Sequence, residues 1–215
     1  MLLPVYLVCD LSASMKGGGR VQALQDALTA LRDSVWLNPV ISDTCRIGVL
    51  GFAGSAWTVV PLCDVAALDE LPALTTAGLT NYGSAFRLLR ETIEGDVAQL
   101  AGDGFRVWRP IVFFVSDGEP TDTRELWRAE LARLVDPGFP VRPEIVAFAV
   151  GEAAAGTLSE IATARCFAAT DGTAVQEAIA GIGDMVIRSV VASGTGGGPM
   201  IPPTPPDGFE EVDLL

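Results

Sequence analysis

The 215-residue sequence contains no histidine and only one lysine, Lys16. The absence of histidine excludes Ser/His/Asp and Cys/His catalytic triads, histidine-ligated zinc sites and the side chain that enzymes most often use as a general base. Positive charge is also scarce, because 14 Lys and Arg stand against 27 Asp and Glu, a formal net charge of −13. Such an acidic chain repels phosphate backbones and anionic lipid headgroups, so we expect neither a nucleic-acid nor a membrane partner.

Long apolar runs and paired cysteines are also missing. The longest uninterrupted apolar stretches, such as residues 111–115, are far shorter than the roughly 20 residues that span a bilayer. The first residues lack the basic region and the cleavage site of a signal peptide, so a cytoplasmic location is expected. The cysteines show no CxxC spacing and mostly fall within or beside apolar runs. This pattern predicts buried, reduced thiols at Cys9, Cys45, Cys63 and Cys166.

Short apolar runs alternate with amphipathic segments through the first 190 residues. Runs rich in Val, Ile and Phe predict strands, whereas apolar residues three and four positions apart predict helices. The alternation predicts a doubly wound α/β domain with a mainly parallel central sheet and helices on both faces. Only residues 53–56 separate two of the strands, which predicts one antiparallel hairpin at the sheet edge. The expected strands are 5–9, 46–52, 57–62, 111–115, 145–150 and 166–169, and the expected helices are 21–35, 85–93, 126–134, 158–164 and 175–190.

The composition changes abruptly near residue 193. Residues 193–206 are rich in glycine and proline, and residues 207–215 combine four acidic with four apolar side chains. We therefore expect one domain over residues 1–192, followed by a flexible linker and an acidic, apolar-tipped tail over residues 193–215. The apolar side chains at the end favour docking of this tail. Docking on the domain itself, capture by a partner and a disordered tail all stay open.

Oxygen-bearing side chains follow the apolar runs at three places. The first run ends in Asp10-Leu-Ser12-Ala-Ser14, the run at 111–115 is followed by Ser-Asp117-Gly, and Thr80 lies in a hydroxyl-rich loop before the second helix. Loops at the carboxyl ends of parallel strands converge, so we expect these side chains to meet. Carboxylates and hydroxyls suit a hard divalent cation, Mg²⁺ or Mn²⁺ in preference to Ca²⁺. With only two carboxylates nearby, the cation would stay electrophilic and accept an Asp or Glu from a protein partner.

These three pieces resemble the metal-ion-dependent adhesion site of von Willebrand factor A domains, which have a Rossmann-like fold, and the resemblance covers about residues 3–191. The amino-acid sequence of residues 116–122 is most similar to that of the bacterial tellurium-resistance TerY-like branch of this family. The resemblance implies that Ser12 and Ser14, and Thr80 in the ligand-engaged state, bind the metal directly, whereas Asp10 and Asp117 act mainly through bound waters. It also implies a cytoplasmic adaptor or scaffold in a stress-response or tellurium-resistance system, with a kinase or phosphatase of the same operon as a partner.

Three further residues are expected on the rim of the site, where they influence which partners bind: Lys16, Glu119 and Asp122. The alternative to protein binding is an enzyme, a metal-dependent phosphoester hydrolase or phospho-acceptor that uses Asp10, because such enzymes place their Asp at a strand end. No carboxylate lies two positions after Asp10 and no GxSxG motif occurs, which favours binding without catalysis. Helix capping by Asp10 and Ser14 is a structural alternative, but it leaves Thr80 and Asp117 unexplained.

Overall fold

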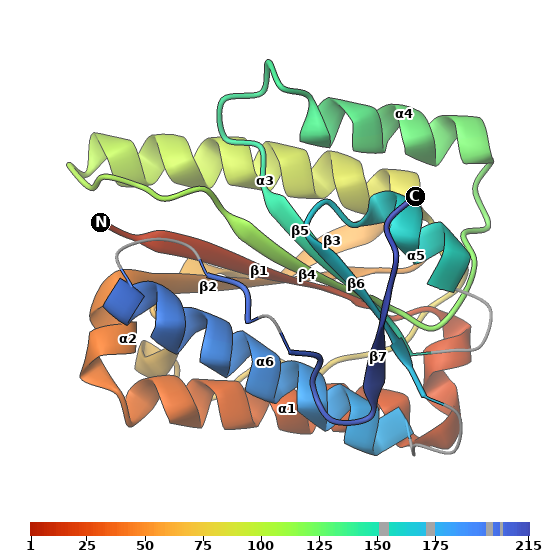
Figure 1. Cartoon of the computed structure of the whole chain (residues 1–215), viewed down its shortest axis with the longest axis horizontal. Helices are drawn as coiled ribbons and strands as arrows, with labels where there is room; N and C mark the ends of the chain where they lie inside the picture. Colours follow the sequence, from red (N-terminus) through yellow and green to blue (C-terminus); the bar gives the residue numbers. More distant parts are fainter. Residues whose placement is uncertain (151–154, 171–174, 197–199, 203) are drawn as a thin grey trace.

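A seven-stranded sheet crosses the centre of the molecule (Figure 1). The computed structural model describes the chain except for residues 151–154, 171–174, 197–199 and 203. The strands are β1 (Leu3–Asp10), β2 (Cys45–Phe52), β3 (Ala56–Cys63), β4 (Ile111–Ser116), β5 (Glu144–Ala149), β6 (Arg165–Ala169) and β7 (Phe209–Val212). Their order across the sheet is β3-β2-β1-β4-β5-β6-β7. The five inner strands are parallel, and β3 and β7 pair antiparallel to β2 and β6 at the two edges.

Helices cover both faces of the sheet, as Figure 1 shows with α1 and α6 on one side and α3 and α4 on the other. Side chains alternate across the sheet because successive residues of a strand point to opposite faces. Thus Val5 and Leu7 pack in the core on the α1 and α6 side, whereas Tyr6 and Val8 pack in the core on the α3 and α4 side. The helical elements are η1 (Ala13–Gly19), α1 (Arg20–Trp36), α2 (Pro39–Thr44), η2 (Val65–Ala67), α3 (Tyr82–Gly102), α4 (Arg124–Val135), α5 (Ala155–Ile161) and α6 (Val175–Gly196).

The architecture confirms the predicted α/β class, the mainly parallel sheet and the antiparallel hairpin, which is formed by β2 and β3. The cysteines are free thiols, three of them buried and Cys63 half-buried. Burial raises the pKa of Cys9 to about 12, and that of Cys45 and Cys166 to about 11, so these thiols stay protonated. Within the described residues, no helix is both long and apolar enough to cross a membrane.

The segment expected to be a linker and tail supplies structure of its own. Helix α6 continues to Gly196, past the predicted boundary at residue 193, and β7 adds a second antiparallel edge strand to the sheet. Phe209 is buried and packs edge-on against Phe148 with ring centroids 5.4 Å apart. The tail therefore docks on the domain itself, one of the alternatives that the sequence left open. The sequence does not signal this strand, because four residues with two central acids carry no clear apolar alternation.

Candidate metal centre

The candidate site lies where β1 and β4 end side by side. Asp10 is the last residue of β1 and Ser116 the last of β4, and these two strands pair in parallel. From β1 the chain first builds β2 and β3 on one side and then crosses to β4 on the other. Such a reversal of strand order opens a crevice at the carboxyl ends of the strands, where ligands bind in folds of this kind.

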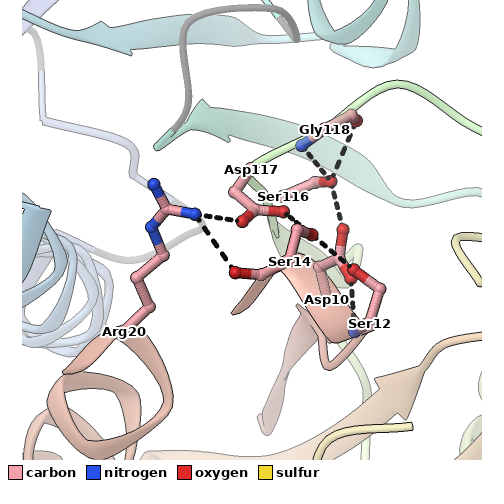
Figure 2. Close-up of polar contacts among 7 residues, drawn as sticks. All are labelled: Asp10, Ser12, Ser14, Arg20, Ser116, Asp117 and Gly118. Carbon is pink, nitrogen blue, oxygen red and sulfur yellow. Dashed lines mark hydrogen bonds and ion pairs between the residues drawn. The ribbon is translucent and has the colours of Figure 1, made fainter. Parts of the chain in front are cut away.

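A continuous series of hydrogen bonds joins four of the five predicted metal ligands (Figure 2). Asp10 Oδ1 accepts a bond from the backbone N–H of Ser12 at 2.8 Å, and the Ser12 and Ser14 hydroxyls are 2.9 Å apart. Ser14 Oγ donates to Asp117 Oδ1 at 2.7 Å across 103 residues of sequence. The fold therefore brings two distant segments together, as the sequence predicted from the convergence of the loops.

Asp10 is fully buried, and this burial raises the pKa of its carboxyl group. Hydrogen bonds from the Ser116 hydroxyl, at 2.5 Å, and from Ser12 oppose that shift, while the nearby Asp117 charge adds to it. Two carboxylates thus share a largely buried cluster. A divalent cation bound there would offset the electrostatic repulsion between them. The residues present fit such a cation. Asp10, Ser12, Ser14 and Asp117 would hold it with hard oxygen atoms, and the cation would supply an electrophilic position for an outside oxygen.

Thr80 lies in a separate loop that hydrogen bonds join to Thr121 and to the loop after β1. Its carbonyl accepts bonds from the backbone N–H and the hydroxyl of Thr121, at 2.7 and 2.9 Å. The N–H of Ala13 donates to Gly78 O at 3.1 Å, which ties the Thr80 loop to the loop after β1. Thr80 is itself buried, and in the described part of the chain no hydrogen bond joins its hydroxyl to the other four residues.

The three predicted rim residues have different surroundings. Lys16 is exposed on η1. Glu119 is exposed and accepts a hydrogen bond from the Thr157 hydroxyl. Asp122 is half-buried, and its two carboxylate oxygens accept the backbone N–H groups of Tyr82 and Gly83 at 3.1 and 2.9 Å. Asp122 thus also holds the start of α3, a role that the sequence analysis did not predict.

The structure adds Arg20 and Ser116 to the site, neither of which was predicted there. Arg20 Nη1 donates to Asp117 Oδ2 at 2.6 Å and to the Ser14 carbonyl at 3.3 Å (Figure 2). Arg20 begins α1 directly after Gly18 and Gly19, whose positive φ angles of 63° and 72° turn the chain back toward the strand ends. No local pattern marks Arg20, because its partner lies 97 residues away. Ser116 could have been found, since it directly precedes Asp117 at the strand end.

Among the described residues, including the candidate site, no group of three or more Asp, Glu, Cys or His side chains could hold a metal ion. The site between β1 and β4 combines two carboxylates with hydroxyl groups. The fold and the site together define a doubly wound α/β domain with a hard-oxygen cluster at its topological switch point.

The profile of the von Willebrand factor type A domain matches residues 5–119, just over half of the chain, so the chain belongs to this family. The structure is similar to proximal thread matrix protein 1 from the mussel byssus, solved with a zinc-occupied MIDAS motif, with 18% identity and a TM-score of 0.62 over 89% of this chain and 48% of that one. It is also similar to a von Willebrand factor type A protein from Catenulispora acidiphila, with 14% identity and a TM-score of 0.62 over 89% and 43% of the two chains.

A third similar structure is the ArnB paralog VWA2 from Sulfolobus acidocaldarius, with 14% identity and a TM-score of 0.56 over 87% of this chain and 44% of that one. This chain thus spans less than half the length of each of these three proteins. At these identities the similarity shows a shared fold. The comparison with curated proteins finds no match.

Proposed function

We propose that this chain is a divalent-metal-dependent protein-binding domain that acts without catalysis, as an adaptor or scaffold. The observation that carries the proposal is the series of hydrogen bonds from Asp10 through Ser12 and Ser14 to Asp117 at the switch point of the sheet. It supports Asp10, Ser12, Ser14, Asp117 and the adjacent Thr80 as the residues that hold the metal. A zinc-occupied MIDAS motif in a protein of the same fold supports a metal at this position.

The donor set supports Mg²⁺ or Mn²⁺ as the metal. It also supports a partner's carboxylate as the group that completes the coordination of that metal. All the side-chain donors are carboxylate or hydroxyl oxygens, which hard cations prefer. Neutral hydroxyls leave much of the cation's charge uncompensated, so an Asp or Glu of a protein partner is a better further ligand than water. Lys16 and Glu119, both exposed, would contact the partner around that carboxylate.

The surroundings of Asp10 argue against the enzyme alternative. A phospho-acceptor or hydrolase that used Asp10 would need a carboxylate oxygen free to attack phosphorus. Asp10 is fully buried, and its two oxygens accept bonds from Ser12 and Ser116. These contacts favour a role for Asp10 in orienting hydroxyl groups. Membership of the TerY-like branch, a tellurium-resistance or stress-response setting, a kinase or phosphatase partner and a cytoplasmic location stay predictions from the sequence.

Metal titration tests the proposal. We expect Mg²⁺ and Mn²⁺ to raise the melting temperature of the wild-type protein, because a ligand that binds only the native state stabilises it. The double variant Ser12→Ala/Ser14→Ala should fold but lose this shift. Ser55→Ala, a serine exposed in the turn between β2 and β3, is the matched control and should keep it. A shift that survives in the double variant would contradict the site assignment.

A further inference from the structure

Arg20 is a positive charge built into an otherwise acidic cluster. Its Nη1 atom lies 2.6 Å from Asp117 Oδ2 and 3.3 Å from the Ser14 carbonyl oxygen, so it contacts two of the residues proposed to hold the metal. The Asp117 side chain has no exposed surface, and that of Arg20 is 26% exposed. Electrostatic interactions in such a shielded place are stronger than at an open surface.

We infer that Arg20 makes the metal-loaded site an anion receptor, at the expense of metal affinity. This inference rests on the proposed function, because it concerns how the metal is held and what then binds to it. With Arg20, the cluster of Asp10, Asp117 and the guanidinium carries a formal charge of minus one, and a divalent cation changes it to plus one. Without Arg20, the same cation would only neutralise the two carboxylates.

This difference matters because the whole chain is acidic, with a formal net charge of −13. The general field of the molecule repels a partner's carboxylate, so attraction has to come from a local positive charge. Arg20 and the metal together provide one, whereas the metal with Asp10 and Asp117 alone does not. The exposed Lys16 nearby adds a charge that solvent and salt screen more strongly.

The hydrogen bonds that Arg20 donates are directed at the proposed metal site. Its Nε atom is buried and has no hydrogen-bond partner among the residues that the structure describes. An arginine that served stability alone would gain more from a carboxylate that engages both Nε and an Nη atom in the bidentate manner. Among the described residues Arg20 donates only through Nη1, and both acceptors belong to the proposed metal site.

The test measures metal binding and carboxylate binding separately. Isothermal titration gives the Mn²⁺ affinity of the wild-type protein and of Arg20→Gln. Acetate and methylammonium, probes of similar size and opposite charge, are then added to protein in excess over Mn²⁺. The paramagnetic relaxation of their methyl protons, per bound Mn²⁺, reports which probe reaches the metal. Arg109→Gln is the matched control, since Arg109 also pairs with a carboxylate, Glu144, but at the start of β4 and β5.

We expect Arg20→Gln to bind Mn²⁺ roughly tenfold more tightly and to lose most of the relaxation of acetate, while methylammonium relaxation does not fall. Arg109→Gln should match the wild type in both measurements. In Arg20→Gln the Mn²⁺ affinity should rise while the acetate relaxation falls. Simple loosening of the loop would not change the two quantities in opposite directions. Arg20→Lys keeps the charge without the guanidinium and should stay within about twofold of the wild type.

Any one of three results would overturn this inference and leave the proposed function standing. They are an unchanged or weaker Mn²⁺ affinity in Arg20→Gln, undiminished acetate relaxation in that variant, or an Arg20→Lys variant that behaves like Arg20→Gln. A wild-type protein that does not bind Mn²⁺ would overturn the proposed function and this inference with it. Thermal unfolding of each variant shows whether the fold is intact, and Arg20→Lys provides the comparison if Arg20→Gln does not fold.

Discussion

At the scale of single residues, the core contains polar side chains whose partners come from other elements. Tyr6 on β1 is fully buried, and its hydroxyl donates to Asp96 Oδ2 of α3 at 2.8 Å. Burial raises the pKa of Tyr6, and the negative charge of Asp96 raises it further. Burial also raises the pKa of the Asp96 carboxyl, an effect that the bond from Tyr6 opposes. Asp96 is thus a partly buried carboxyl group whose side chain accepts one hydrogen bond from Tyr6.

This pair makes stability depend on pH in a direction that can be tested. The folded-state pKa of Asp96 lies above its unfolded value of about 3.9, so the folded protein holds the proton more tightly. The contribution of Asp96 to stability is therefore present at low pH and is lost as pH rises through the folded-state pKa. Asp96→Asn does not titrate and keeps an acceptor for Tyr6. We expect urea unfolding to show a larger stability gain of Asp96→Asn over wild type at pH 7 than at pH 4.5, and an equal difference would contradict this account.

At the scale of elements, α3 depends on side chains at its first turn. The first N–H groups of a helix have no partner within the helix. Asn81 accepts the Ser84 N–H at 2.8 Å, and Asp122 accepts those of Tyr82 and Gly83. A Cβ atom at position 83 would lie 2.9 Å from Asp122 Oδ2, so Gly83 allows this close approach. The same segment carries Thr80, and the start of α3 therefore links helix stability to the proposed metal site.

We expect Asp122→Ala to lower the free energy of unfolding by about 1–2 kcal/mol, because two N–H groups lose their acceptor. It should also weaken Mg²⁺ binding, since the Thr80 loop next to α3 loses an anchor. Glu125→Ala, which removes an exposed acid from the first turn of α4, is the control and should change both quantities little. Chemical denaturation and metal titration measure the two effects, and equal losses in both variants would contradict the anchoring role.

At the scale of the whole molecule, the chain returns to its own sheet after α6. The Ser189 hydroxyl donates to Met200 O at 2.6 Å and the Met200 N–H donates to Ser193 Oγ at 2.8 Å, which holds the returning segment against the helix. Figure 1 shows β7 running beside β6 at the sheet edge. Arg165 of β6 pairs with Glu211 of β7 at 2.7 Å. An edge that would otherwise expose the hydrogen-bonding groups of β6 is thereby covered.

Two glycines of α6 allow a matched test of how the returning segment and β7 are held in place. A Cβ atom at Gly181 would lie 2.8 Å from the backbone oxygen of Asp207, whereas one at Gly183 would meet Ala27 at an ordinary 3.5 Å. Replacement by alanine favours the helix equally at both positions. We expect Gly181→Ala to speed amide exchange over Phe209–Val212 at least tenfold, because the returning backbone has to shift, and Gly183→Ala to leave it unchanged. Slow exchange in both variants would show that β7 docks independently of this contact.

The sequence by itself determined the features that depend on neighbouring residues. Apolar runs such as residues 111–115 identified the inner strands, because a strand buried on both faces is mostly apolar. The short link between β2 and β3 identified the hairpin, and the spacing of Asp10, Ser12 and Ser14 gave three of the five predicted site residues. Convergence of loops at the strand ends then added Asp117, which the structure places against Ser14. Each of these inferences uses a local pattern or a general rule of sheet topology.

Only the tertiary structure decided the pairings between distant segments that no local pattern marks. Arg20 reads as an ordinary first residue of a helix, and its contact with Asp117 depends on the turn at Gly18 and Gly19 and on the placement of β1 beside β4. Phe209–Val212 reads as part of an acidic tail, and it becomes a strand because β6 offers an open edge and Phe148 a packing surface. In both cases the stabilising contact lies outside the segment itself, so its free energy is gained only once the remainder of the domain has folded.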